Sequence, residues 1–552
     1  MADTTLGAGA AARPGLFLRN ATGLVKAWST FDAFVYSFWS VNLITLGLYG
    51  MSFVYTVPDG QLLVAILLFG VLTTFLVVTY AMLVSVMPRT GGDYAWQSRV
   101  LGGGLGFVLS ITGWWFTLFL WAPIYANILV VQFFSPLAYT LGWTGVATFF
   151  TSQTGVFVSC LIVLAFVAIV VTMGMETYAR IQKICFWIGL VGLAVVCVIL
   201  LFSSQSDFQS AFNREASSLF GAPANAYQAT IDAASKAGFA GSDFGHFSFG
   251  PVLLLLPWLA FYLLWPNWGA TLYGEVRGAK DIRKPFWSMF WGLWVTVAMV
   301  AVVVILIVKT MGWNFYQSAN SLYWGSLYGG PAPIVPIWPY PVMFAGWLVD
   351  NHLFQALLII VMGLWFFGWA GTLFLSSTRV IFAAAFDRVL PSWAANISAK
   401  RRVPYGSLVL MIVPSLVVSA VYAYKPNFAS VFLDATAVLA LTFLATVVAA
   451  IILPWRRKDL YDASPVARYK IGGIPTITIV GVITAIFLLF MLYEWSFNAA
   501  DLYGTSFQST LNSVYYFVAT YVVAIVIYVA ARIIRSRQGI DLRRIHHEIP
   551  VE

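Results

Sequence analysis

The stretch Phe249–Pro285 reads FGPVLLLLPWLAFYLLWPNWGATLYGEVRGAKDIRKP, and it decides how the rest of the chain is interpreted. It begins as an apolar run suited to the bilayer interior and is interrupted at Trp265–Gly269. Pro266 lacks an amide hydrogen and clashes with the preceding turn, so we expect a helix break here. Unpaired backbone cannot face lipid, so such a break must line a cavity or be covered by protein. A proline kink without function is the alternative, because Gly and Pro are common in membrane helices.

The composition is that of a polytopic membrane protein. The chain has 552 residues, of which 61% are hydrophobic and only 9% are charged. A soluble protein of this size would be about 25% charged. Residues 1–30 are small, polar and weakly basic, and the first apolar run is too long for a signal peptide, so we expect no cleaved leader.

The chain shows no pattern typical of an enzyme or a metal protein. Its three cysteines all fall in apolar runs, which leaves no disulfide framework outside the membrane. Its four histidines lie in loops, in the tail or at the end of a span, so no buried pair is available for haem or a metal ion. We therefore predict no catalytic residues, no metal site and no organic cofactor.

Twelve apolar runs are long enough to cross the membrane. They lie at about 31–57, 61–87, 106–134, 153–173, 182–203, 250–273, 287–311, 352–385, 406–424, 431–453, 474–495 and 512–533. The predicted organisation is an N-terminal segment (1–30), one transmembrane domain (31–533) and a tail (534–552). The fold class is thus an all-α polytopic membrane protein.

The basic residues predict the orientation. If the N-terminus is cytoplasmic, only four of the 30 Lys and Arg residues fall in external segments: Arg214, Lys236, Lys309 and Lys425. This asymmetry places both termini inside the cell. The net charge of +9 therefore reflects topology and contact with lipid headgroups, and we expect no nucleic-acid partner. The two long loops, 204–249 and 312–350, are then external and are expected to cap the outer face or to be merely decorative; five prolines should stiffen 331–341.

Span 1 is also irregular. Ser37, Ser40, Asn42 and Thr45 punctuate it, and two glycines follow. Because the first and sixth spans are both interrupted, we predict a 5+5 inverted repeat with broken helices 1 and 6. Repeat one covers about 31–203, repeat two about 250–453, and two extra C-terminal helices lie at about 474–533.

Four segments carry a resemblance to a known family. They are PRTGGDYAW at 88–96, LGGGLGF at 101–107 leading to Gly113-Trp114, GEVR at 274–277, and SSTR at 376–379 leading to AFDRVLP at 385–391 and Val403-Pro404. In this order and spacing they resemble the amino acid–polyamine–organocation permease superfamily. The third segment departs from that pattern, because Gly278-Ala279 replaces the family's Asn-Pro pair.

Several residues in these segments have a physical reading of their own. Gly91 and Gly92 are suited to a tight turn, although a simple loop explains them as well. Arg379 lies in an apolar run and needs a partner, for which Asp387 is a candidate unless it caps the loop. Glu275 stands beside Arg277, where it forms an ion pair or gate contact, or stays solvated. We class Gly91, Gly92, Glu275 and Arg379 as gate or structural residues.

The resemblance implies a substrate with a carboxylate, an ammonium group or both, bound where spans 1 and 6 break. Backbone amides at the first break would bind the carboxylate, and carbonyls at the second would accept from the ammonium. The substrate-binding candidates on this basis are Ser40, Asn42, Thr45, Gly47, Phe261, Tyr262, Trp265, Asn267 and Trp114. Trp114 and its neighbour Trp115 are also candidate gate aromatics.

Charge near the breaks bears on the substrate. The nearest carboxylates we identify are Asp32 at the inner start of span 1 and Asp434 at the outer start of span 10. Without an acidic residue at mid-depth, a cationic side chain would lack a partner, which favours a neutral, apolar amino acid.

The coupling ion is open between sodium and a proton. Proton-coupled relatives resemble one another in a lysine deep in span 5, and this chain has none at 186–191; Lys183 lies nearer the inner mouth. Ser376 and Ser377 could supply oxygens to sodium, although hydroxyls on membrane helices more often bond their own backbone.

A secondary active transporter (permease) of amino acids is thus the leading function. The alternatives are a transporter of another small amine or organocation and a non-transporting amino-acid sensor with the same fold.

Overall fold

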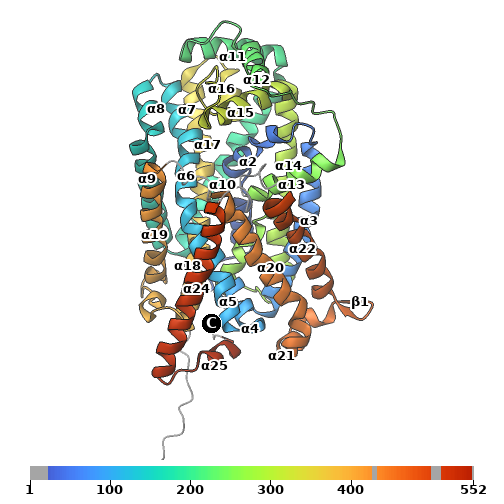
Figure 1. The fold of residues 1–552 in the computed structure, drawn as a ribbon, viewed down its shortest axis with the longest axis vertical. Coiled ribbons are helices and arrows are strands. Elements are labelled where there is room, and N and C mark those ends of the chain that lie inside the picture. Colours follow the sequence, from blue (N-terminus) through green and yellow to red (C-terminus); the bar gives the residue numbers. More distant parts are fainter. Residues whose placement is uncertain (1–22, 426–431, 499–510, 550–552) are drawn as a thin grey trace, which may run out of the picture.

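The computed structural model describes residues 23–425, 432–498 and 511–549, without the side chains of 432–434 and 511–513. Asp434 therefore lies outside the described side chains. Within these ranges twelve helices are long and apolar enough to cross a membrane, which confirms the all-α polytopic fold. They run together through the long axis of the molecule (Figure 1).

Spans 1 to 5 lie between Thr30 and Phe202. They are span 1, α1 (Thr30–Val41), η1 (Leu43–Gly47) and α2 (Leu48–Met51); span 2, α3 (Leu62–Val86); span 3, α5 (Gly103–Ile111), η3 (Thr112–Thr117), η4 (Leu118–Leu120), α6 (Trp121–Leu129), η5 (Val130–Phe134) and α7 (Ser135–Thr140); span 4, α9 (Gln153–Thr172); and span 5, α10 (Met175–Phe202).

Spans 6 to 12 complete the bundle. They are span 6, α13 (Phe249–Leu263) and η6 (Pro266–Glu275); span 7, α14 (Arg283–Thr310); span 8, α17 (His352–Trp369) and α18 (Thr372–Phe386); span 9, α19 (Tyr405–Tyr424); span 10, α20 (Phe432–Arg456); span 11, α22 (Thr476–Tyr493) and η10 (Glu494–Asn498); and span 12, α24 (Leu511–Arg537).

Helix packing follows the spacing of five expected for two related halves. The contacts occur in matching pairs, in which each span of one contact is replaced by the span five places away. Span 1 packs on span 7, and likewise span 6 on span 2. Span 5 packs on span 8 as span 10 does on span 3, and span 3 packs on span 4 as span 8 does on span 9. Successive spans reverse direction, so a span and its counterpart five later run in opposite senses. The two halves are therefore related as an inverted repeat, the arrangement that places broken helices face to face.

Spans 1, 3, 6, 8 and 10 form the protein-enclosed core. Of the most apolar 18-residue stretch of each span, 89% of the residues are buried in span 1 and 72% in span 6. Only 11% are buried in the corresponding stretch of span 12. Spans 11 and 12 thus lie at the periphery, where their apolar side chains suit lipid. The predicted breaks fall in the most enclosed helices, as the need to pair broken backbone requires.

The two ends of the bundle differ (Figure 1). At one end, which we call the cap end, α11 (Gln205–Phe220), α12 (Ala226–Lys236), α15 (Trp313–Leu327) and α16 (Pro341–Trp347) pack together. The two long loops, 204–249 and 312–350, therefore lie over the same end of the bundle, and they do so mostly as helices. At the other end, the basic end, lie α4 (Asp93–Val100), α21 (Lys458–Asp462), a hairpin of β1 (Lys470–Ile471) and β2 (Ile474–Pro475), and α25 (Leu542–His547).

Short elements complete the described chain. They are η2 (Val54–Thr56), α8 (Thr144–Thr151), η7 (Ser392–Ala395) and η9 (Pro465–Arg468).

Candidate functional site

Span 1 breaks at Asn42. This residue has φ 25° and ψ 102°, a conformation that Asn tolerates better than most residues. Its side-chain oxygen accepts from the Thr45 N–H at 2.9 Å, and its amide nitrogen donates to the Trp365 carbonyl at 3.4 Å. Asn42 thus ends one helix and caps the next, a five-residue π-helical turn.

Span 6 breaks between Leu263 and Pro266, where the proline predicted it. The chain continues as η6, a 3₁₀-helix of ten residues, although runs beyond three or four are uncommon. Hydroxyls from two other spans hold its first turn: Ser37 Oγ donates to the Pro266 carbonyl at 2.9 Å, and Ser376 Oγ donates to the Trp268 carbonyl at 3.0 Å. Spans 1 and 8 therefore fix the start of η6.

Aromatic rings from spans 3 and 6 fill the space beside the two breaks. Trp121 lies at the centre, stacked on Phe261 with ring centroids 5.6 Å apart and within 6.0 Å of Trp265 and Trp268. Trp114 approaches Trp268 edge-on at 6.1 Å. We call these five side chains the aromatic cluster.

Polar atoms around the aromatic cluster lack partners. Among the described residues, Thr45 Oγ1, Tyr262 Oη, both amide atoms of Asn267, and the indole nitrogens of Trp121 and Trp268 are fully buried without a geometrically good hydrogen bond. Each such group costs about 1–3 kcal/mol in a closed protein. Their gathering at the two breaks marks the place where a polar ligand would repay that cost.

The other substrate-binding candidates lie at the same place but use their polar groups internally. Ser40 Oγ donates to the Tyr36 carbonyl, and Trp265 Nε1 donates to the Phe261 carbonyl at 2.7 Å. Gly47 allows close packing, because a Cβ there would stand 3.4 Å from the Tyr262 ring.

The two serines of span 8 differ. Ser376 joins Tyr36 Oη (2.6 Å) to η6, whereas Ser377 donates to the Leu373 carbonyl of its own helix.

Arg379 does not pair with Asp387, and Glu275 does not pair with Arg277. Arg379 and Glu275 pair with each other through two hydrogen bonds of 2.8 and 3.2 Å, both side chains being essentially unexposed. Arg277 instead donates to the Lys26 carbonyl. The pair joins the end of η6 to α18 at the basic end, so a buried ion pair links the broken span 6 to span 8 there.

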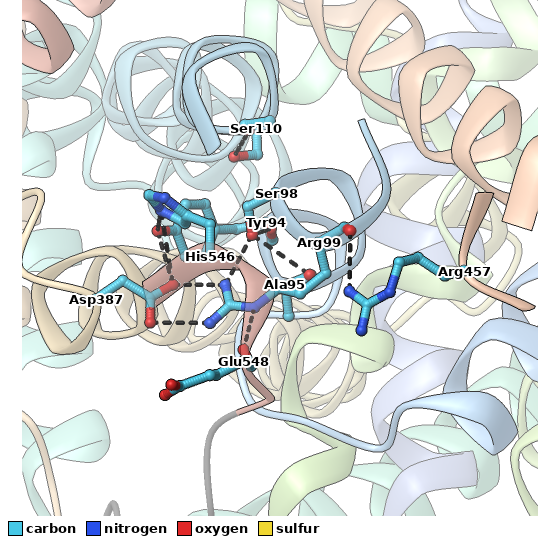
Figure 2. A network of polar contacts seen from close by, with 10 residues as sticks. Tyr94, Ala95, Ser98, Arg99, Ser110, Asp387, Arg457, His546 and Glu548 are labelled. Atoms are coloured by element: carbon cyan, nitrogen blue, oxygen red, sulfur yellow. Dashed lines mark hydrogen bonds and ion pairs between the residues drawn. The ribbon is translucent and has the colours of Figure 1, made fainter. Parts of the chain in front are cut away.

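Asp387 belongs to a second buried network (Figure 2). Arg99 meets it with both terminal nitrogens, one at 2.9 Å, and Tyr94 Oη donates to it at 2.9 Å. His546 of α25 lies against Tyr94 and Asp387, and Arg99 Nε reaches the Glu548 carbonyl at 3.3 Å. The C-terminal segment therefore covers the ion pair that joins α4 to the loop after α18.

Gly91 and Gly92 dock α4 onto η6. Both have positive φ, and the Gly91 N–H donates to the Thr271 carbonyl at 2.9 Å. A Cβ on Gly92 would lie 3.0 Å from the Ala270 backbone. The tight turn expected at these glycines is thus a point of close backbone contact with the second break.

This docking brings a carboxylate beside the second break. Asp93, the first residue of α4, is fully buried and accepts from Tyr80 Oη, Thr446 Oγ1 (2.6 Å) and Trp114 Nε1 (3.1 Å). Burial raises the pKa of Asp93 to about 6, against the partly offsetting effect of hydrogen bonds from Thr446, Tyr80 and Trp114. Asp93 begins α4, outside the twelve spans, so it does not stand at mid-depth in a span. It is nevertheless a buried carboxylate next to η6 that the sequence interpretation did not identify.

The sequence interpretation also missed residues on span 3. Trp121 follows Trp114 by two helical turns, so a shared face was a usable signal. Gln132 donates to the Thr45 carbonyl at 3.0 Å, and its place in a π-helical turn left no trace in the hydropathy pattern. Asp93 is part of the motif at 88–96, but nothing in the sequence indicated that its side chain is buried.

Comparison with known families settles the class of protein. The model of the family described as "Amino acid permease" matches residues 28–530, which includes all twelve spans except the end of the last. The chain belongs to the amino acid permease family. The permease is therefore a multi-pass membrane protein of the amino acid–polyamine–organocation superfamily, and its family points to a transporter of amino acids rather than to an enzyme. No curated protein matches it.

The buried pair of the permease gives a stability prediction. Arg379→Met leaves the Glu275 carboxylate buried without its partner, and we expect a loss of about 3–5 kcal/mol. The double variant Arg379→Met/Glu275→Met should recover most of this loss. The thermal midpoint of the purified protein measures both, and a double variant as unstable as the single one would contradict the assignment of the pair.

The carboxyl of Asp93 gives a pH prediction. Its pKa of about 6 lies above the ordinary 3.8, so the folded state binds more protons between these values. The stability of the wild type relative to Asp93→Asn should therefore fall as pH rises from about 4 to 6, by roughly 3 kcal/mol, and stay level above. Thermal midpoints of both proteins across this range test it, and parallel curves would contradict the raised pKa.

Proposed function

We propose that the permease carries neutral, largely apolar amino acids across the membrane by alternating access. The observation that carries the proposal is the meeting of two broken helices in the enclosed core, with unpartnered polar atoms and aromatic rings around them. Such a place offers hydrogen bonds to a zwitterion and an apolar surface to its side chain.

The first break suits the substrate carboxylate. The opening N–H groups of a helix have no partners within it, and here the Asn42 side chain satisfies only that of Thr45. The N–H groups of Leu43 and Ile44 precede it at the positive end of the second half of span 1, a place that favours an anion. The unpartnered Thr45 hydroxyl adds a donor at the same level.

The second break suits the ammonium group. The last carbonyls of α13 have no partner within the helix, and Trp265 occupies only that of Phe261. The carbonyls of Tyr262 and Leu263 and the Asn267 amide oxygen are then the acceptors. The aromatic cluster covers the substrate side chain.

Closure at both ends supports alternating access. At the basic end, Glu275 and Arg379 join η6 to α18. At the cap end, the Phe53 ring stacks between Trp258 and Trp324, with centroids 4.7 and 4.4 Å apart, which joins the end of span 1 to span 6 and to α15. Opening one closure while the other holds would expose the site to one side at a time. We propose that the basic end is cytoplasmic, which puts both termini inside.

Two alternatives have a specific basis. Aromatic rings around a site also attract cations, which favours an amine or organocation as second candidate substrate. A sensor would bind the same ligand without moving it. The coupling ion, sodium at Ser376 and Ser377 or a proton, is a separate question, because transport of an amino acid does not depend on which ion drives it.

A matched ligand series tests the substrate class. Phenylalanine, phenethylamine and phenylpropionate share one side chain and differ in carboxylate and ammonium, so only phenylalanine uses both breaks. It should raise the thermal midpoint of the purified permease, corresponding to about 2.7 kcal/mol at 100 times its Kd. Stabilisation by phenethylamine alone would replace the proposal with an organocation carrier. Binding without exchange or accumulation in proteoliposomes would replace it with a sensor.

Asn267 and Thr45 test the site itself. Asn267→Ala and Thr45→Ala each remove a hydrogen bond to a charged group of the substrate, worth about 1.5–3 kcal/mol, so Kd should rise roughly tenfold to a hundredfold. Asn396→Ala, at an exposed position, is the matched control and should keep the wild-type affinity. Binding and uptake at equal expression measure the effect, and wild-type values in both site variants would move the site elsewhere.

A further inference from the structure

We propose that Asp93 is the proton-binding group through which the permease couples amino acid transport to a pH gradient. This inference rests on the proposed function and adds the driving ion and the residue that takes it. It stands on the position of Asp93, on the donors around it and on the link from these donors to the substrate site.

Asp93 is held by three spans at once. Tyr80 comes from span 2, Trp114 from span 3 and Thr446 from span 10, and each donates to its carboxylate. The turn before it is packed on η6 through Gly92. A change in the charge of this carboxyl is therefore felt by the helices that enclose the second break.

Apart from Tyr80, the charged and titratable groups on the neighbouring elements form no hydrogen bond or ion pair with Asp93 in the part of the chain that the structure describes. Arg89, in the turn before it, donates to the Pro88 carbonyl, and its buried Nε has no partner. On α4 and α25, Tyr94, Arg99 and His546 gather on Asp387; at the junction of η6 and α18, Glu275 pairs with Arg379. Of the groups that hold Asp93, only Tyr80 is titratable, and it is a neutral donor. Asp93 thus has no cation as a partner among the described residues, which leaves its charge dependent on protons.

Protonation would be transmitted to the second break through Tyr80. When Asp93 is ionised, the Tyr80 hydroxyl donates to it. When the carboxyl takes a proton, its own O–H can donate to Tyr80 Oη, and the Tyr80 hydrogen is then free to turn to the neighbouring Asn267, whose amide oxygen lacks a partner. One proton therefore changes the hydrogen bonding of a residue that we place in the substrate site.

Trp114 provides a second link. Its indole N–H donates to the carboxylate while its ring contacts Trp268 of the aromatic cluster. A hydrogen bond to an ionised acceptor is roughly twice as strong as one to a neutral acceptor. Neutralising Asp93 weakens this bond and so loosens a side chain against the site.

The surroundings favour a proton over a metal cation. Sodium requires several oxygen ligands, but one carboxylate oxygen of Asp93 accepts from an indole nitrogen, which cannot ligate a cation. The pKa of about 6, raised by burial, also allows the carboxyl to gain and lose a proton near neutral pH.

Proteoliposomes test the proposal. With the membrane potential held at zero by valinomycin and equal potassium, a gradient of about one pH unit, alkaline inside, should concentrate phenylalanine up to about tenfold in the wild type for one proton per substrate. Asp93→Asn should lose this accumulation and keep sodium-independent exchange of phenylalanine across the membrane. Asp462→Asn, an exposed carboxyl paired with Lys458, is the matched control and should accumulate as the wild type does.

The outcomes separate the two proposals. No exchange or binding of amino acid by the wild type would overturn the proposed function itself. Exchange together with accumulation by Asp93→Asn would overturn only the role of Asp93. Accumulation driven by a sodium gradient, at equal pH on both sides, would assign the coupling to sodium and overturn the proton assignment.

The variant Thr446→Val tests the titration of Asp93 through the pH dependence of uptake, which a purely structural role of Thr446 would leave unchanged. It removes one donor to the ionised carboxyl, so the pKa of Asp93 should rise and the pH dependence of uptake should shift to higher pH. Reduced uptake with an unshifted pH profile would reduce Thr446 to a packing contact and contradict the proposed titration of Asp93.

Discussion

The structure depends on one constraint, that a peptide chain broken inside a membrane must find hydrogen bonds from its neighbours. Span 1 meets it with Asn42, which caps its own second half, and with Gln132 of span 3, which donates to the carbonyls beyond the break. Span 6 meets it with Ser37 and Ser376, which hold the first carbonyls of η6. Polar side chains on spans 1, 3 and 8 thus make the two interruptions possible.

These supporting groups form hydrogen bonds with only part of the backbone at the two breaks. The polar atoms that remain without partners are the ones available to a ligand. Buried polar atoms without partners cost stability in any protein. The large aromatic rings around them exclude water and supply packing that offsets the cost. In the function that we propose, a small zwitterion completes the hydrogen bonds of this site and so stabilises it.

The sequence was sufficient for what hydropathy and proline chemistry determine locally. All twelve spans were placed, and Pro266 located the second break, because both signals act within a few residues. Partners distant in the chain could not be found in this way. Arg379 reaches Glu275, 104 residues away, whereas the sequence offered the nearer Asp387 as a candidate partner, with capping of the loop as its other role. Asp93 was overlooked because burial of α4 follows from docking on η6, and no periodicity in eight residues reports that.

The last helix has a consequence for how the molecule is made. Residues 542–547 form α25, which covers Arg99 and Asp387 at the basic end, and Gly103 gives it room, since a Cβ there would collide with the His546 ring. During synthesis the twelve spans emerge in order, and this segment leaves the ribosome after all of them. The basic end therefore stays uncovered until this segment has been made, and it is then covered by residues that follow every span.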